Sequence, residues 1–180
     1  FGITVEEFHQ KNISRQKNWP HSMLNTSTHD SKRSEDVRAR ISLLSEFPEE
    51  WKAKLDYWSE LNKGHKRQVT GLISSPLYHN ILPSKGKGKP IPDPNTEYLL
   101  YQTLIGAWPL GDLEGEILDD FRQRIQSYMT KAVKEAKVHT SWLNPAPDYE
   151  EALQEFIEVL LDPDRSPVFH KDFLPFQQKI

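Results

Sequence analysis

The stretch TSTHDSKRSEDVRAR, residues 26–40, places His29 and Asp30 directly ahead of a dense run of charged residues. Lys32 and Arg33 follow closely, and nearby positive charge keeps a carboxylate such as that of Asp30 ionised. An ionised carboxylate beside a sugar ring can hold ring hydroxyls and stabilise an oxocarbenium-like transition state. The simpler alternative is that these side chains only form the solvated start of a helix. The pattern by itself leaves both interpretations open.

Other chemistries have less support at this segment. Adjacent residues rarely both face one metal ion, and no third ligand stands at a suitable spacing from His29 and Asp30. No feature marks any serine as the nucleophile of a Ser-His-Asp triad. The sequence has no cysteine, which excludes disulfides, thiolate metal sites and a cysteine nucleophile. We therefore expect no metal site here.

The elements before and after this segment determine where the side chains of His29 and Asp30 lie in the fold. Residues 22–26 are short and partly apolar, and they predict a strand or an extended segment. Ser34 is a suitable N-cap, and Glu35 and Asp36 suit the first turn of a helix because of the helix dipole. A His-Asp pair between a strand and a helix is where a (β/α)8 barrel places catalytic groups.

Most of the remaining chain has the apolar periodicity and the end signals of α-helices. Capping boxes open two of them, at Thr4–Glu7 and Asp148–Glu151. The fold class that we expect is mostly α, with six or seven helices and one short strand. The expected helices cover about 4–17, 34–44, 48–64, 96–108, 113–137 and 148–161, with a last one from 166.

Residues 65–95 are different, because glycine and proline are frequent there. Much of this range predicts a flexible loop. Its KGKGK motif at 85–89 is either a mobile lid or a solvated loop, and the solvated loop is the simpler interpretation. Apolar pairs between residues 72 and 82 can dock as short segments.

The composition limits the function classes. With 180 residues, 36% hydrophobic and 11% aromatic, the chain can bury a real core and is unlike a disordered protein. The net charge of -3 gives no reason to expect a nucleic acid or an anionic membrane as partner. No apolar run approaches the roughly 18 residues of a membrane span. Because the sequence has no cysteine, a reducing cytosol is the simplest compartment, and we expect a cytoplasmic protein.

Several segments, taken in order, resemble the maltooligosyl trehalose synthases of the α-amylase family. THDSKRSEDVRAR is similar to the stretch that carries the fourth conserved motif of that family, after barrel strand seven. FGITVEEFH, RQKNWPHSML, PDPNTEYLLYQTLIGAWPL, YMTKAVKEAKVHTSWLNP and YEEALQEFI resemble further pieces of the same enzymes. The resemblance covers nearly the whole chain and weakens only at about 65–90.

This resemblance implies an intramolecular transglucosylation in trehalose biosynthesis. The reducing-end α-1,4 linkage of a maltooligosaccharide becomes an α,α-1,1 linkage, without a cofactor. The resemblance makes Asp30 the transition-state stabiliser and His29 its partner in binding the sugar hydroxyls. Lys32 and Arg33 match the motif and are expected to face the substrate or to support the residues that do.

The family's nucleophilic aspartate and its acid/base glutamate have no match in this sequence. The resemblance therefore implies an internal fragment of an isomerase, whose partner is the remainder of its own polypeptide. Residues 1–45 would be a piece of an incomplete (β/α)8 barrel, and 46–180 a helical insertion domain. The alternatives are a non-catalytic helical module that binds oligosaccharides or other partners, and a hydrolytic relative of the amylases.

Five tryptophans give further expectations. Trp51, Trp58 and Trp108 lie on apolar helical faces and are expected in the core. Trp142 could be a platform on which a sugar stacks, with His139 bonding a hydroxyl, or it could fill the core at a helix end. The pattern favours the core for Trp142, and it does not decide the role of Trp19.

Overall fold

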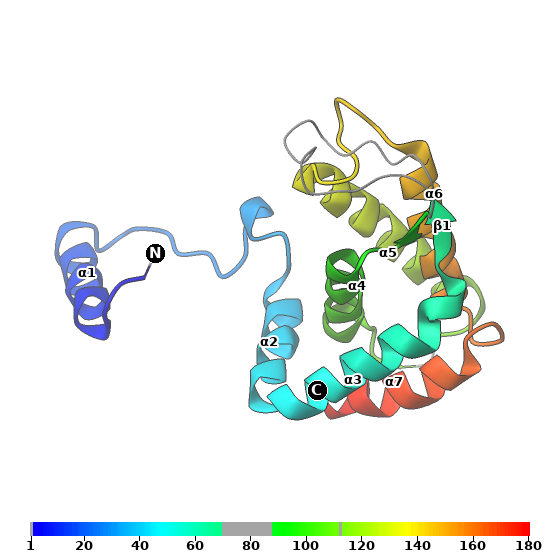
Figure 1. Cartoon of the computed structure of the whole chain (residues 1–180). Coiled ribbons are helices and arrows are strands. Elements are labelled where there is room, and N and C mark those ends of the chain that lie inside the picture. The colour runs from blue at the N-terminus through cyan, green and yellow to red at the C-terminus, as the bar shows by residue number, and fades with distance from the viewer. Residues whose placement is uncertain (1, 70–87, 112) are drawn as a thin grey trace. The chain divides into compact units, whose positions relative to one another are not determined.

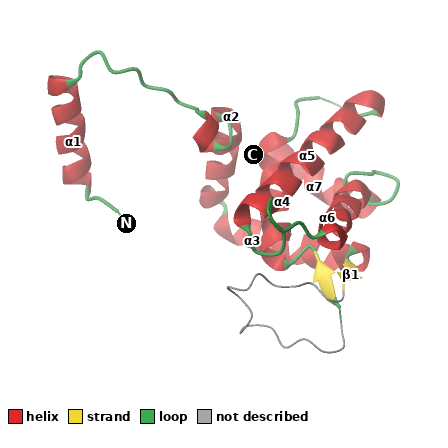
Figure 2. Ribbon diagram, turned by 90° about the horizontal axis from the view of Figure 1, so that it is seen from above, coloured by secondary structure: helices red, strands yellow, loops and turns green. Residues whose placement is uncertain are grey.

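The computed structural model describes residues 2–69, 88–111 and 113–180. Within them it has seven α-helices and two short strands, as Figures 1 and 2 show. This confirms the mostly α fold class with six or seven helices. The elements are α1 (Val5–Asn18), α2 (Glu35–Leu43), α3 (Pro48–Leu61), β1 (Arg67–Val69), β2 (Lys89–Ile91), α4 (Pro94–Ala107), α5 (Gly115–Ala136), α6 (Pro147–Leu160) and α7 (Pro167–Lys179).

The chain divides into two compact units, residues 1–35 and 36–180. The first holds α1 and the His29–Asp30 segment, and the second holds the helices from α2 onwards together with the two strands. The expected division into a barrel piece, 1–45, and an insertion domain, 46–180, stays a prediction.

In the first unit, α1 begins at the predicted capping box. The backbone N–H of Glu7 donates to Thr4 Oγ1 at 3.2 Å, and the N–H of Thr4 donates to Glu7 Oε2 at 2.9 Å. The strand considered for residues 22–26 is absent, and Met23 and Leu24 are exposed. A strand needs a neighbour to receive its backbone hydrogen bonds, and the described residues supply none at this place.

The core of the second unit surrounds Trp58 of α3. Its ring lies 5.4 Å from those of Tyr101 and Phe173 and 5.6 Å from that of Phe169, measured between centroids. Helix α4 is buried around much of its circumference. Trp51, Trp58 and Trp108 are all buried, so the expected core positions are confirmed.

A charged pair is buried beside this aromatic cluster. Lys66 Nζ lies 2.7 Å from Glu97 Oε2, and both side chains are under one-tenth exposed. Glu97 also accepts hydrogen bonds from Ser59 Oγ at 3.0 Å and from the Tyr101 hydroxyl at 3.1 Å. Burial, with the charge of Glu97, raises the pKa of Tyr101 well above its usual value, so its hydroxyl stays protonated and can donate.

The two strands form an antiparallel pair next to α6, with Arg67 opposite Ile91 and Val69 opposite Lys89. Figure 2 shows them in yellow beside that helix. The range 65–95, expected to hold a loop, therefore starts and ends in ordered elements. The expected docking pairs at 72–82 and most of KGKGK lie outside the described residues.

Helix α2 packs closely on α4 through a glycine. A Cβ atom at Gly106 would lie 2.7 Å from Val37 Cγ1 and 3.1 Å from Ile41, which is closer than van der Waals contact allows. The Arg40 guanidinium donates to the carbonyls of Trp108, at 2.7 Å, and Gly106, at 3.3 Å. This arrangement fixes the chain where it leaves α4.

We expect Lys66→Ala to lower the free energy of unfolding by about 3–5 kcal/mol, because it leaves the buried Glu97 carboxylate without its counter-charge. Lys63→Ala is the matched control. It breaks an exposed pair with Glu60 and should change stability by about 0.5 kcal/mol or less. Urea unfolding of both variants, followed by circular dichroism, measures the difference. Equal losses in the two variants would contradict the structural role of the buried pair.

Candidate active-site segment

His29 and Asp30 lie on a short 3₁₀ turn, His29–Ser31, between an extended Thr28 and a left-handed Lys32. Lys32 has φ 62°, and its backbone N–H donates to the carbonyl of His29 at 3.3 Å. The turn therefore closes on itself within a few residues. It places the two side chains consecutively at the tip, where both are exposed.

The hydroxyl of Ser31 holds this turn together. Ser31 Oγ donates to the carbonyl of Thr28 at 2.7 Å and accepts from the backbone N–H of the same residue at 3.2 Å. It also lies 3.2 Å from Ser27 Oγ and 3.1 Å from the carbonyl of Arg33. One small side chain thus links both ends of the segment, a role that the sequence analysis did not assign to Ser31.

A second hydrogen bond joins the start of the segment to the first residue of α2. Thr26 Oγ1 donates to Glu35 Oε1 at 2.7 Å. Residues 26–35 therefore form a closed loop that leads into α2, as the N-terminal signals of that helix predict. Backbone preorganisation of this kind lowers the entropy that a side chain at the tip loses when it binds a ligand.

The four predicted site residues are all brought onto this loop. Within the part of the chain that the structure describes, the His29 ring and the Asp30 carboxylate have no hydrogen-bond partner, and both are exposed. Lys32 is exposed too, whereas Arg33 is half-buried. The geometry suits an acceptor and a neighbouring imidazole that face a ligand outside the loop.

Other carboxylates at helix starts serve the fold. Glu35 accepts the hydrogen bond of Thr26, and Glu97 forms the buried pair with Lys66. Both carboxylates therefore have a structural role in the fold.

The segment at His139 and Trp142 departs from the favoured expectation. Trp142 is 60% exposed, so the interpretation that it fills the core is wrong. Lys134 Nζ lies 4.9 Å from the centre of its ring, within range of a cation–π contact. The turn ahead of α6, where Ser141 and Asn144 hydrogen-bond each other, holds the indole away from the core.

His139 contacts a half-buried acid, Asp93. The Nε2 atom of His139 lies 3.3 Å from Asp93 Oδ2. The same oxygen accepts hydrogen bonds from the hydroxyl of Thr96, at 2.7 Å, and from that of Tyr149, at 3.2 Å. Burial alone would raise the pKa of Asp93, but the hydrogen bonds from His139 and Thr96 outweigh it and hold that pKa well below its usual value. Asp93 therefore stays charged, and His139 helps to join the start of α4 to α6.

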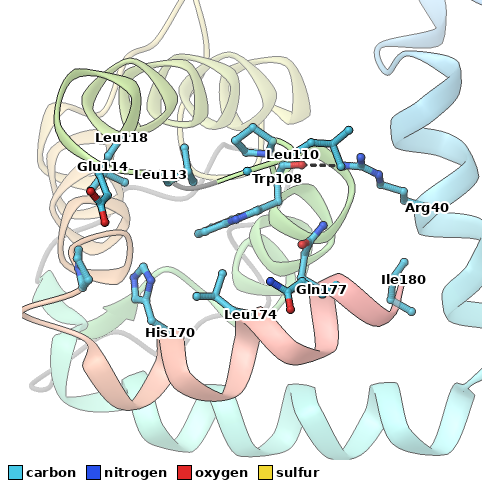
Figure 3. A pocket seen from close by; sticks show the side chains of 14 residues that line it. Arg40, Trp108, Leu110, Leu113, Glu114, Leu118, His170, Leu174, Gln177 and Ile180 are labelled. Carbon is cyan, nitrogen blue, oxygen red and sulfur yellow. Dashed lines mark hydrogen bonds between the residues drawn. The ribbon is translucent and has the colours of Figure 1, made fainter.

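The second unit also contains a pocket of about 600 Å³, which the sequence analysis did not anticipate (Figure 3). Trp108, Leu113, Leu174 and Gln177 are among the residues that line it, from the end of α4, the start of α5 and α7. These residues are far apart in the sequence, so no local motif could have indicated the pocket.

We expect Trp58→Ala to lower the free energy of unfolding by about 3–5 kcal/mol, because it empties the centre of the aromatic cluster. Trp142→Ala removes the same side chain from an exposed position and should cost about 1 kcal/mol or less. Thermal and urea unfolding of the two variants give the comparison. A loss at Trp142 as large as that at Trp58 would mean that Trp142 is part of the core after all.

Comparison with known proteins gives a consistent result. No protein-family model matches the sequence. A Mycobacterium tuberculosis protein that carries the provisional name maltooligosyl trehalose synthase is 35% identical over 162 residues, which are 90% of this chain and 17% of that protein. A crystal structure of a hypothetical maltooligosyl trehalose synthase from Sulfolobus tokodaii is 31% identical, with a TM-score of 0.69 over 99% of this chain and 20% of that one.

A further crystal structure, described as maltooligosyl trehalose synthase, is 34% identical with a TM-score of 0.71. It covers 99% of this chain, which again corresponds to 20% of the solved one. Among the described residues, no helix combines the length and the apolarity needed to cross a bilayer. The chain spans about one fifth of the length of the proteins that it matches. The resemblance inferred from the motifs is therefore confirmed, and the chain is similar, in sequence and in fold, to part of the maltooligosyl trehalose synthases.

Proposed function

We propose that this chain is part of an isomerase that converts the reducing-end α-1,4 linkage of a maltooligosaccharide into an α,α-1,1 linkage. The observation that carries the proposal is the His29–Asp30 pair, exposed at the tip of a loop that Ser31 holds in shape. The name of the relatives supports the reaction class, and the matched segments support the assignment to this chain.

The proposed reaction is a transfer within one molecule. The bond from C1 of the penultimate glucose to O4 of the terminal glucose breaks, and O4 gains a proton. The released glucose stays bound, and its anomeric oxygen loses a proton as it bonds to the same C1. No atom is gained or lost, so neither water nor a cofactor is consumed.

Positive charge develops at C1 and at the ring oxygen while these bonds change. In the proposal, Asp30 accepts hydrogen bonds from hydroxyls of the distorted sugar, and its charge stabilises the transition state. His29 bonds neighbouring hydroxyls. Lys32 and Arg33 add positive charge around the loop.

Two further carboxyl groups are needed. A retaining enzyme holds its nucleophile and its acid/base group about 5 to 5.5 Å apart across the scissile bond. Asp30 can fill neither role, and the proposal assigns both to the remainder of the polypeptide, together with the barrel on which residues 1–45 would lie.

In the complete enzyme, we expect Asp30→Asn to lower kcat by about a thousandfold or more, since it removes the charge that faces the transition state. The fold should be unaffected, because the side chain is exposed, with a change in stability of about 0.5 kcal/mol or less. Initial rates with maltotetraose measure the effect. Asp36→Asn, a nearby exposed acid, is the control, and equal rates in the two variants would refute the proposal.

We expect the 180-residue chain alone to form no trehalose linkage from maltotetraose, because one stabilising carboxylate cannot replace a nucleophile and an acid/base group. Chromatography of the products after long incubation tests this. Appearance of the α,α-1,1-linked product, abolished by Asp30→Asn, would contradict the assignment of the other two groups to the remainder of the polypeptide.

A non-catalytic module that binds oligosaccharides is the second candidate. The exposed Trp142 ring favours it, since aromatic faces bind sugars by stacking. In that case the Asp30→Asn substitution would leave turnover of the complete enzyme unchanged.

A further inference from the structure

The pocket of the second unit combines apolar walls with polar groups whose hydrogen bonding is incomplete. In Figure 3 the Trp108 side chain lies between Leu113 on one side and Leu174 and Gln177 of α7 on the other. Its volume of about 600 Å³ lies within the range of about 300–1,000 Å³ that is usual for small-molecule pockets.

Two of these polar groups belong to nearly buried residues. Gln177 is 8% exposed and Trp108 is 5% exposed. Within the residues that the structure describes, neither the Gln177 carboxamide nor the Trp108 indole N–H has a hydrogen-bond partner. Neither group is among the fully enclosed polar atoms that lack a partner, which in the described part of the chain are Trp51 Nε1, Asn62 Oδ1 and Arg122 Nε. Both groups are therefore accessible from the pocket that they line, where a ligand with hydrogen-bonding groups can pair with them.

The other polar groups at the pocket limit which kind of ligand it can bind. The guanidinium of Arg40 is already bonded to two backbone carbonyls. Burial lowers the pKa of His170, so its ring is neutral, and Nε2 lies 3.0 Å from the Leu160 carbonyl. Glu114 lies at the exposed rim. The available groups are thus an indole N–H, a carboxamide and one rim carboxylate, which suit hydroxyl groups better than a strongly charged ligand.

We propose that this pocket binds a glucosyl unit of an α-1,4-linked glucan. The apolar side chains of Trp108, Leu113 and Leu174 would cover the C–H face of the sugar. Gln177 and the Trp108 indole N–H would bond its hydroxyls, and Glu114 would accept from a hydroxyl at the rim. The choice of a glucan as ligand rests on the proposed function, whereas the pocket and its unpaired groups do not.

Titration of the 180-residue chain, labelled with ¹⁵N, with maltotriose tests this. Among the five tryptophan indole signals, we expect the signal of Trp108 to shift most and to saturate. Gln177→Leu should weaken the affinity about tenfold, the effect of losing a hydrogen bond to a buried group. Gln123→Leu, on an exposed face of α5, is the matched control and should bind as the parent does.

Gln177→Leu breaks no hydrogen bond within the described structure, so it should fold, and circular dichroism checks this. If it did not fold, Glu114→Gln at the exposed rim would serve in its place, with an expected loss of severalfold in affinity. No shift of the Trp108 signal at high millimolar maltotriose would overturn the proposal. Equal binding by the parent and the pocket variants would overturn it too.

Asp30→Asn separates this proposal from the proposed function. The pocket proposal is read from the Trp108 signal, and Asp36→Asn, the exposed control of the proposed function, should leave the titration of that signal as in the parent. Binding that is lost in Asp30→Asn and kept in Gln177→Leu would reject the pocket and leave the role of Asp30 intact. Unchanged turnover of Asp30→Asn in the complete enzyme would reject the proposed function, while the titration would still decide whether the pocket binds sugar.

Discussion

The buried pair of Lys66 and Glu97 is the constraint around which the second unit is organised. A carboxylate at 3% exposure is tolerated only when its charge and its lone pairs are met, and here a lysine and two hydroxyls meet them. These partners come from α3, from the residues after it and from α4. The pair therefore fixes the end of α3 against the start of α4, and β1 begins at the very next residue, Arg67.

Local signals in the sequence were enough to predict the helices. The capping box of Thr4 and Glu7 and the apolar circumference of α4 are properties of neighbouring residues, and the structure has both. No strand forms at residues 22–26. A strand, unlike a helix, needs hydrogen-bond partners from another part of the chain, and local sequence signals do not supply them. The pairing of β1 with β2 likewise joins two short segments within a range that its glycines and prolines mark as a loop.

The candidate sites also differ in whether their interactions are local in the sequence. The loop that carries His29 and Asp30 was accessible to sequence reasoning because the hydrogen bonds of Thr26 and Ser31 that close it join residues fewer than ten positions apart. The motif indicated Asp30, although it gave no role to Ser31. The pocket around Trp108 and Gln177 is made by helices that meet only in the folded chain. A tryptophan on an apolar face was expected in the core, and the same tryptophan also forms a pocket wall.

The uneven burial of the five tryptophans has a spectroscopic consequence. Trp51, Trp58 and Trp108 are 7% exposed or less, whereas Trp19 and Trp142 are 71% and 60% exposed. Indoles in water emit at longer wavelengths and are open to ionic quenchers, and buried indoles are shielded from both effects. The chain therefore carries two natural classes of fluorophore. The exposed class has one member in each unit, and all of the shielded class belongs to the second unit.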